Sequence, residues 1–398
     1  MIDEQPIVLT DEFFQDPHAT YERLRERGPV HHVRFPHGVI GWLVTDYALA
    51  RQVLSEPTIS KNLRAVADDN RLVGGATIAD PGNSQHMLNA DPPHHTRMRK
   101  LVDRAFTPAA VAALAPRITA IADELLDTIA PGETVDLLRQ YAFPLPITVI
   151  CELLGVPAAD RTDFQRWSGE LVTAQSHAAK ADANTQLAKY FDDLIAERRS
   201  DGGADLLSGL IRATEAGDRL SPDELRSNAL LLLIAGHETT VNLIASCVPA
   251  LPDDARVRQS IATDSLATKA FREEVLRYHS PVHITTFRYT TAPSTLADLR
   301  IEAGELIMVS LGAGNRDRGR FADPDTFRPD RIDNHHIAFG YGAHFCLGAP
   351  LARLETDIAL SRLLTRFPAL TLAIDSARLR WRPSVVIRGL TELPVHCR

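Results

Sequence analysis

The chain has 398 residues, of which 44% are hydrophobic and 24% are charged, a composition typical of a globular protein with a substantial core. Its 51 Asp and Glu against 43 Lys and Arg give a formal net charge of −8, which argues against a nucleic-acid-binding protein. The first residues contain acids and no long apolar run, so we expect no signal peptide and no membrane anchor. These features predict a soluble, cytoplasmic protein.

The hydrophobic pattern predicts helices in the middle of the chain and strands toward both ends. A helix is expected over 17–28, followed by strands over 29–35 and 41–45. The pattern from Asp91 to Tyr278 is helical. Strand-like alternation returns in 283–290 and 305–312, another helix follows Cys346, and 381–395 is expected to form a hairpin-like strand region. We predict one mainly α domain over 1–398, with a small β region built from distant segments.

One long helix can be placed closely. Ser221 is a suitable N-cap, Pro222 suits the first helical position, and Glu224 completes a capping box. The apolar run continues to about Val248, which gives a helix of ~40 Å, long enough to cross a whole domain. It is apolar nearly all round, so we expect a buried central helix. The polar residues 237–240 argue against a membrane span.

The cysteines fall into two kinds. Cys151 and Cys247 lie in apolar helical runs, where a cysteine usually fills the core. Cys346 instead lies in the stretch FGYGAHFCLGAPLAR, between glycines and just before a helix. The helix N-terminus favours a thiolate there, and a single thiolate in a glycine-rich loop suits a haem iron with one protein ligand. From these residues alone, a nucleophilic cysteine remains the alternative.

The same stretch resembles the haem-binding loop of the cytochrome P-450 family. The matching positions are Phe339, Gly340, Gly342, His344, Cys346, Gly348, Leu351, Ala352 and Arg353. The resemblance extends over nearly the full chain and is to the soluble bacterial class. It implies the cytochrome P-450 fold, with the long central helix crossing over haem b and the Cys346 thiolate as the axial iron ligand.

Other family motifs follow in order along the chain. Glu274 and Arg277 match an E-x-x-R pair, which alone would suggest a surface ion pair. The resemblance instead implies a buried pair joined by Arg331 that supports the cysteine loop. The stretch AGHETT matches the oxygen-activation motif, with Ala235 beside the haem, Glu238 as the acid and Thr239 as the alcohol. A zinc HExxH motif is excluded because Val241 stands where the second histidine would be.

The resemblance also implies further contacts with the haem and the substrate. His95, Arg99, Arg288 and His344 match the residues that bind the propionates. The expected substrate pocket contains Leu231, Ile234, Ala235, Ile284 and Ile387, with a variable loop from about Asn62 to Met87 above it. This lining is apolar and suggests a hydrophobic small molecule.

The resemblance predicts a haem-thiolate monooxygenase that inserts one oxygen atom of O2 by hydroxylation or epoxidation. Bacterial secondary metabolism is the expected setting, with a polyketide or macrolide, a terpenoid or a steroid as substrate. We expect a monomer that receives electrons from a ferredoxin and a ferredoxin reductase, steered by Arg97, Lys100, Arg104, Arg362 and Arg366. Two alternatives are a non-catalytic haem-thiolate or gas-sensing protein and a peroxide-dependent peroxygenase; the intact acid and alcohol argue against both.

Overall fold

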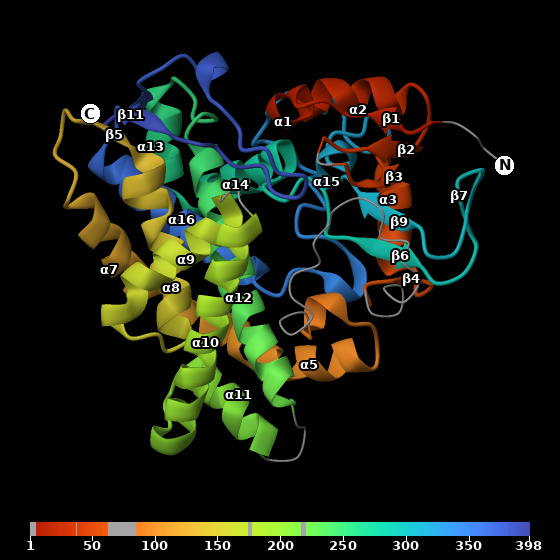
Figure 1. The fold of residues 1–398 in the computed structure, drawn as a ribbon. Helices are drawn as coiled ribbons and strands as arrows, with labels where there is room; N and C mark the ends of the chain where they lie inside the picture. Colours follow the sequence, from red (N-terminus) through yellow and green to blue (C-terminus); the bar gives the residue numbers. More distant parts are fainter. Residues whose placement is uncertain (1–4, 37, 63–84, 174–176, 216–219) are drawn as a thin grey trace. The chain divides into compact units, whose positions relative to one another are not determined.

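The structure is a computed structural model that describes residues 5–36, 38–62, 85–173, 177–215 and 220–398 (Figure 1). Its contacts divide the chain into two compact units. Unit 1 consists of Met1–Ala76, Ala122–Ala142 and Thr239–Arg398, and unit 2 of Thr77–Ile121 and Phe143–Glu238. Most of the expected variable loop lies outside the described residues.

Unit 1 contains a mixed six-stranded sheet with the order β1-β2-β3-β9-β6-β4. Its strands are β1 (Ile7–Val8), β2 (Val30–Arg34), β3 (Ile40–Val44), β4 (Ile59–Ser60), β6 (Arg288–Thr290) and β9 (Leu306–Val309). The parallel pairing of β3 with β9 joins residues more than 260 positions apart. This pairing confirms the prediction that distant segments build the sheet.

Two smaller sheets complete the strands described in unit 1. One has the order β10-β11-β5, from Thr371–Leu372, Pro394–His396 and Thr134–Asp136, and the other pairs β7 (Ser294–Leu296) with β8 (Leu299–Ile301). The expected hairpin over 381–395 was mostly wrong, because only the isolated bridge Trp381–Leu390 joins its two arms. Pro383 and Pro394 remove backbone donors from these arms, which accounts for the short pairing.

Among its described residues, unit 1 also contains the ends of α7 (Ala115–Leu126) and of the central helix, together with seven whole α-helices. They are α1 (Glu12–Gln15), α2 (Pro17–Arg25), α3 (Tyr47–Ser55), α13 (Ala255–Thr263), α14 (Ser265–His279), α15 (Leu311–Gly314) and α16 (Ala349–Arg366). An apolar cluster that includes Leu243, Phe271, Val275 and Leu360 packs α14 and α16 against the end of the central helix. The cysteine loop lies between α14 and α16 in the sequence, and both of these helices are anchored in this apolar cluster.

Unit 2 is helical in its described residues. It contains α5 (His94–Asp103), α6 (Pro108–Ala113), most of α7 (Ala115–Leu126), α8 (Pro144–Leu153), α9 (Arg161–Thr173), α10 (His177–Asp201) and α11 (Leu206–Glu215). Short 3-10 turns at Met87–Asn89, Arg104–Phe106 and Ala158–Asp160 connect them. Among the described residues from 91 to 278, β5 is the only strand, and helices joined by short loops make up the rest.

The central helix α12 (Pro222–Cys247) confirms the predicted bounds within one residue. The capping box forms as expected: Ser221 N–H donates to Glu224 Oε2 at 2.8 Å, and Glu224 N–H donates to Ser221 Oγ at 3.1 Å. By length and composition α12 could cross a membrane, but 72% of its most apolar window is buried within the protein. This burial is typical of a core helix.

Candidate active site

Cys346 lies in a glycine-rich loop directly before α16. Its backbone N–H donates to the carbonyl of Phe339 at 2.9 Å, which closes the loop on itself. Gly340 and Gly342 have φ values of 74° and 73°, in the left-handed region that favours glycine. The loop thus presents the thiol of Cys346 at an exposed position near a helix N-terminus, where the helix dipole stabilises negative charge.

All four cysteines are described, and Cys346 differs from the other three. Cys151, Cys247 and Cys397 are buried, whereas Cys346 is exposed. Burial raises the pKa of Cys151 to about 12 and also raises the pKa of Cys247 and Cys397. These three thiols are therefore poor metal ligands, and the prediction that Cys151 and Cys247 belong to the core is confirmed.

Two sets of contacts hold the cysteine loop against the rest of unit 1. A Cβ on Gly342 would lie 2.8 Å from the carbonyl oxygen of Leu54, so the loop packs directly on the end of α3. The Arg353 guanidinium lies 4.5 Å from the centroid of the Phe339 ring and donates to both carboxylate oxygens of Glu273, at 2.8 and 2.9 Å. Burial alone would raise the pKa of Glu273, but hydrogen bonds from Arg353 and His336 hold that pKa well below its ordinary value.

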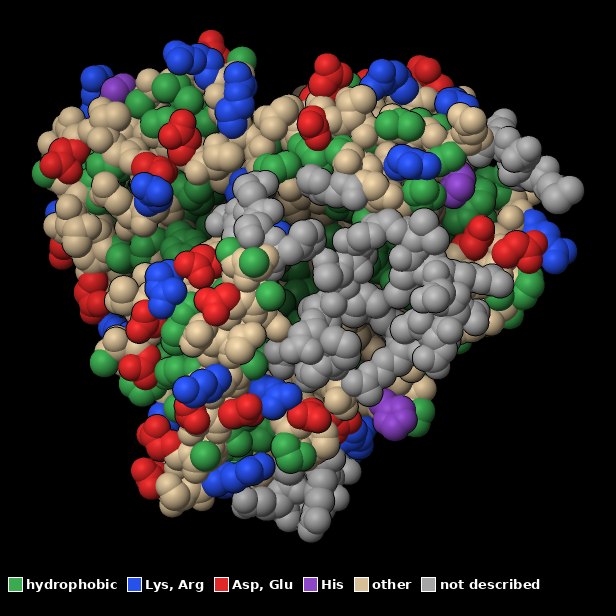
Figure 2. Space-filling view, in the orientation of Figure 1, with side chains coloured by type: hydrophobic (Ala, Val, Ile, Leu, Met, Phe, Trp, Pro, Cys, Tyr) green, Lys and Arg blue, Asp and Glu red, His purple; other side chains and the backbone are tan. Residues whose placement is uncertain are grey.

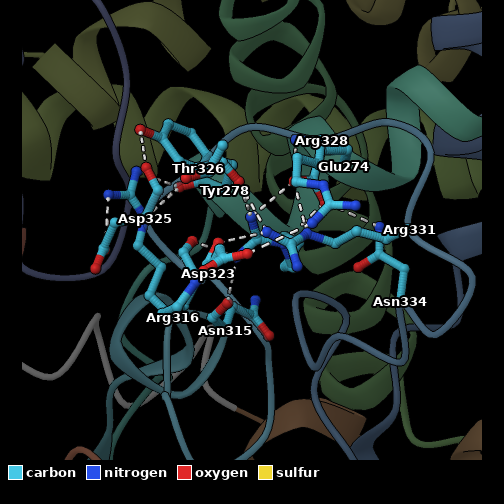
Figure 3. A network of polar contacts seen from close by, with 12 residues as sticks. Glu274, Tyr278, Asn315, Arg316, Asp323, Asp325, Thr326, Arg328, Arg331 and Asn334 are labelled. Carbon is cyan, nitrogen blue, oxygen red and sulfur yellow. Dashed lines mark hydrogen bonds and ion pairs between the residues drawn. The ribbon is translucent and has the colours of Figure 1, made fainter.

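Glu274 lies in a network of polar contacts (Figure 3), and its ion-pair partner is Arg277. Both side chains are fully buried, which excludes the surface ion pair, and Arg277 donates to both carboxylate oxygens at 2.7 and 2.8 Å. Arg331 Nε donates to Glu274 Oε1 at 3.1 Å, as the resemblance implied. The remaining Arg277 donors reach the carbonyls of Asn315, Pro324 and Thr326. This network, called the scaffold cluster below, joins α14 to the segment that leads into the cysteine loop.

One face of α12 is open, although the helix is mostly buried. Leu231, Ala235 and Thr239, spaced four residues apart, are all at least partly exposed, whereas Glu238 is buried. Glu238 belongs to unit 2 and Thr239 to unit 1. Side chains four residues apart share a helix face. The open face therefore carries the predicted alcohol and the small Ala235, with the acid beside it in sequence.

The four residues expected at the propionates lie on three elements and in both units. His95 and Arg99 are at positions i and i+4 of α5 in unit 2, and Arg99 also pairs with Asp103 at 3.4 Å. Burial and then the charge of Arg99 lower the pKa of His95. In unit 1, Arg288 is buried on β6 and His344 is half-buried in the cysteine loop. Each unit thus supplies one arginine and one histidine, and both side chains can donate hydrogen bonds to a carboxylate.

The expected pocket residues divide into exposed and buried ones. Leu231 and Ile234 are half-buried on α12, and Ile387 is half-buried in the C-terminal segment. Ile284 is fully buried in an apolar cluster with Phe13, Phe35 and Met308. The structure therefore places Ile284 in the core of unit 1, and its assignment to the pocket remains a prediction.

The sequence assigned no role to two buried polar residues of α12, although His237 lies within the AGHETT motif. His237 lies 2.8 Å from Ser168 Oγ of α9 in unit 2, and Asn242 accepts a bond from Arg382 Nη2 at 3.0 Å in unit 1. The available signal was their position inside an otherwise apolar helix. Their partners are 69 and 140 residues away, a distance over which the sequence pattern gives no pairing.

Three of the five basic residues expected to steer an electron donor are paired within the chain. Arg97 pairs with Glu224 in unit 2, and in unit 1 Arg362 donates to Asp123 at 2.9 Å while Arg366 lies 3.3 Å from Asp127. The face drawn in Figure 2 likewise intersperses acidic and basic side chains among the described residues. These pairs reduce the local positive charge that was expected.

Comparisons with known proteins identify the family of the chain. The model of the family "Cytochrome P450" matches residues 250–380. The chain is 46% identical over 397 residues to cytochrome P450 107B1 of Saccharopolyspora erythraea, covering 98% of this chain and 97% of that protein. It is 43% identical over 393 residues to the vitamin D(3) 25-hydroxylase of Pseudonocardia autotrophica, covering 98% and 96%. The solved structure of the tirandamycin C-bound P450 monooxygenase TamI aligns with a TM-score of 0.89 at 42% identity, covering 99% and 100%.

The chain belongs to the cytochrome P450 family, and its predicted fold class is confirmed. It is an oxygen-incorporating oxidoreductase, and the family and fold imply haem b with a cysteine thiolate as the axial ligand. The donor set fits this group: the exposed cysteine lies at a helix N-terminus, and Gly348 leaves space close to its Sγ, which a Cβ would approach to 4.0 Å. The family also implies redox partners, O2 and a hydrophobic substrate.

Proposed function

We propose that Cys346 is the axial ligand of the haem and that Glu238 and Thr239 deliver protons for the oxidation of a hydrophobic small molecule. The observation that carries this proposal is the exposure of Cys346 in the glycine-rich loop, while the other three thiols are buried. Bound there, the haem would supply oxygen activation, which a thiolate ligand favours. His95, Arg99, Arg288 and His344 would bind its propionates, and Phe339, Gly340, Gly348 and Ala235 would lie against it.

The chain's own residues would control where protons go. Thr239 would hold a water with its hydroxyl at the open face of α12, and Glu238 would pass protons to that water. The scaffold cluster of Glu274, Arg277 and Arg331 would fix the segment before the cysteine loop. We further propose that residues 1–398 act as one domain, since the relatives described above match the chain almost from end to end.

The proposed substrate is a polyketide or macrolide, with steroid-like and terpenoid molecules as the next candidates. Relatives are named as a 6-deoxyerythronolide B hydroxylase, a mycinamicin IV hydroxylase/epoxidase and a polyketide biosynthesis cytochrome P450. The partly exposed Leu231 and Ile234 of α12 supply apolar surface for such a molecule. We propose a cytoplasmic monomer that receives electrons from a ferredoxin and its reductase.

Thr239→Ala tests the proposed proton delivery. The change removes one hydroxyl and leaves Cys346 and the apolar residues in place, so substrate should still bind. Positioned proton transfer is typically worth about 10²–10⁴-fold, so most of the O2 consumed should leave as hydrogen peroxide. The measurement compares NAD(P)H used, peroxide released and product formed with a ferredoxin system. Thr240→Ala is the matched control, and equal coupling in Thr239→Ala and the wild type would contradict the role of Thr239.

A further inference from the structure

The turn of α12 that carries Glu238 is packed closely into unit 2. A Cβ added to Gly236 would lie 3.0 Å from Ile150 Cδ1 of α8, so the backbone of the turn lies directly against that side chain. The next residue, His237, is completely buried. The contacts of the His237 side chain therefore contribute to the position of this turn within unit 2.

Two hydrogen bonds fix the imidazole of His237. Nδ1 lies 2.8 Å from the carbonyl oxygen of Leu233, and Nε2 lies 2.8 Å from Ser168 Oγ. A carbonyl oxygen can only accept, so Nδ1 carries a hydrogen, and the second hydrogen bond joins Nε2 to the Ser168 hydroxyl. The Phe143 ring packs edge-on at 5.8 Å between centroids. These contacts fix the plane of the ring and the hydrogen at Nδ1.

The position of Ser168 is fixed by the packing of its helix. It is fully buried on α9, whose Phe164 packs edge-on against Phe191 of α10 at 5.5 Å. Tyr190 of α10 also packs on Phe164 at 4.8 Å and donates its hydroxyl to Asp160 Oδ2 at 2.6 Å. Through the Ser168 hydroxyl, His237 is therefore hydrogen-bonded to a well-packed pair of helices, α9 and α10.

His237 is also the neighbour of the proposed acid. Its Nε2 lies 3.9 Å from Glu238 Oε2, beyond hydrogen-bond distance, and both side chains are almost fully buried. We propose that the Ser168–His237 pair is a positioning device: it holds this turn of α12 so that the Glu238 carboxyl can serve Thr239. The inference rests on the proposed function, because it assigns the two residues a part in proton delivery.

Measurements of coupling and of substrate affinity test the positioning role of Ser168 and His237. Ser168→Ala and His237→Phe remove the bond at Nε2, and His237→Phe keeps an aromatic ring. We expect product per NADPH to fall about five- to tenfold in both, because small displacements of a catalytic group are costly, with an unchanged substrate Kd from the haem spin-state shift. Ser168→Thr retains the hydroxyl and should restore coupling. Ser208→Ala is the matched control, since it removes another buried serine hydroxyl of unit 2, bonded to Asp205 at 3.0 Å.

A second readout does not depend on turnover. Histidine-selective ¹⁵N NMR of the reduced, CO-bound protein, with His237 assigned by its loss in His237→Phe, should show a ring protonated at Nδ1. The Nε2 resonance should shift in Ser168→Ala and stay in Ser168→Thr. Wild-type coupling in Ser168→Ala, or an equal loss in Ser208→Ala, would overturn the positioning role. If the wild-type protein lacked the CO spectrum of a thiolate-ligated haem, the proposed function would fail first, whereas normal turnover with no effect of Ser168 would refute only this inference.

Discussion

The scaffold cluster and the cysteine loop both belong to unit 1, but the first buries its functional groups and the second exposes its thiol. In the scaffold cluster, Glu274 and Arg277 are fully buried and bond to each other and to backbone carbonyls. In the cysteine loop, Cys346 and Phe345 are exposed, and backbone bonds and left-handed glycines hold the loop. A buried pair of charges with all its hydrogen bonds inside the protein is typical of a structural role. An exposed thiol held by its backbone loop is instead available to bind a cofactor.

Removing a charge from the scaffold cluster should have the largest effect on the protein. Glu274→Ala would leave Arg277 and Arg331 without the carboxylate that both bond, and stranding a buried charge costs ~3–5 kcal/mol. We expect little haem-loaded protein and a large fall in the free energy of unfolding, measured by haem content and urea denaturation. Glu302→Ala, which removes an exposed carboxylate paired with Arg300, is the control. Normal haem content in Glu274→Ala would remove the scaffold role.

Adding one methyl group to the cysteine loop should have a smaller effect. Gly342→Ala needs a side chain at φ 73°, with its Cβ 2.8 Å from the Leu54 carbonyl oxygen. Backbone strain of this kind costs on the order of 1–3 kcal/mol, so we expect reduced haem retention, measured by the rate of haem transfer to apomyoglobin. Gly209→Ala is the control, because Gly209 lies outside the loop, has no positive φ and leaves open space around an added Cβ. Unchanged retention in Gly342→Ala would mean that the loop tolerates displacement.

The buried histidine His283 of unit 1 should make the stability of the protein depend on pH. His283 lies 3.0 Å from Tyr21 Oη, and burial followed by the charge of Arg388 lowers its pKa to about 3. Unfolded histidine binds a proton near pH 6.5, so between these values the unfolded state holds more protons and stability falls as pH falls. The loss at pH 5.5 should be ~1 kcal/mol.

His283→Gln should reduce this acid sensitivity. Urea midpoints at pH 7.5 and 5.5 measure it, with the exposed His335→Gln as control. Equal pH dependence in His283→Gln and the wild type would show that His283 contributes nothing to it.

The sequence predicted best the features that depend on neighbouring residues. The start of α12 follows from Ser221, Pro222 and Glu224, and local hydrogen bonds fix that helix end. The bond between Arg331 and Glu274 joins residues 57 positions apart, and only the resemblance indicated it. The Ser168–His237 bond was not predicted, because a serine in an amphipathic helix has the same local pattern whether it is exposed or bonded. The hairpin expected over 381–395 was mostly wrong because Pro383 and Pro394 limit pairing between its arms, and β11 pairs instead with the distant strands β5 and β10.

The CO spectrum of the dithionite-reduced protein shows directly whether a cysteine thiolate binds the haem iron. A thiolate-ligated haem gives a strongly red-shifted Soret band, and we expect this band in the wild type and in Cys151→Ser and Cys247→Ser, which should lose mainly stability. Cys346→Ser should lose the red-shifted band. A wild-type band like that of a histidine-ligated haem, or a red-shifted band that persists in Cys346→Ser, would contradict the assignment of Cys346 as the iron ligand.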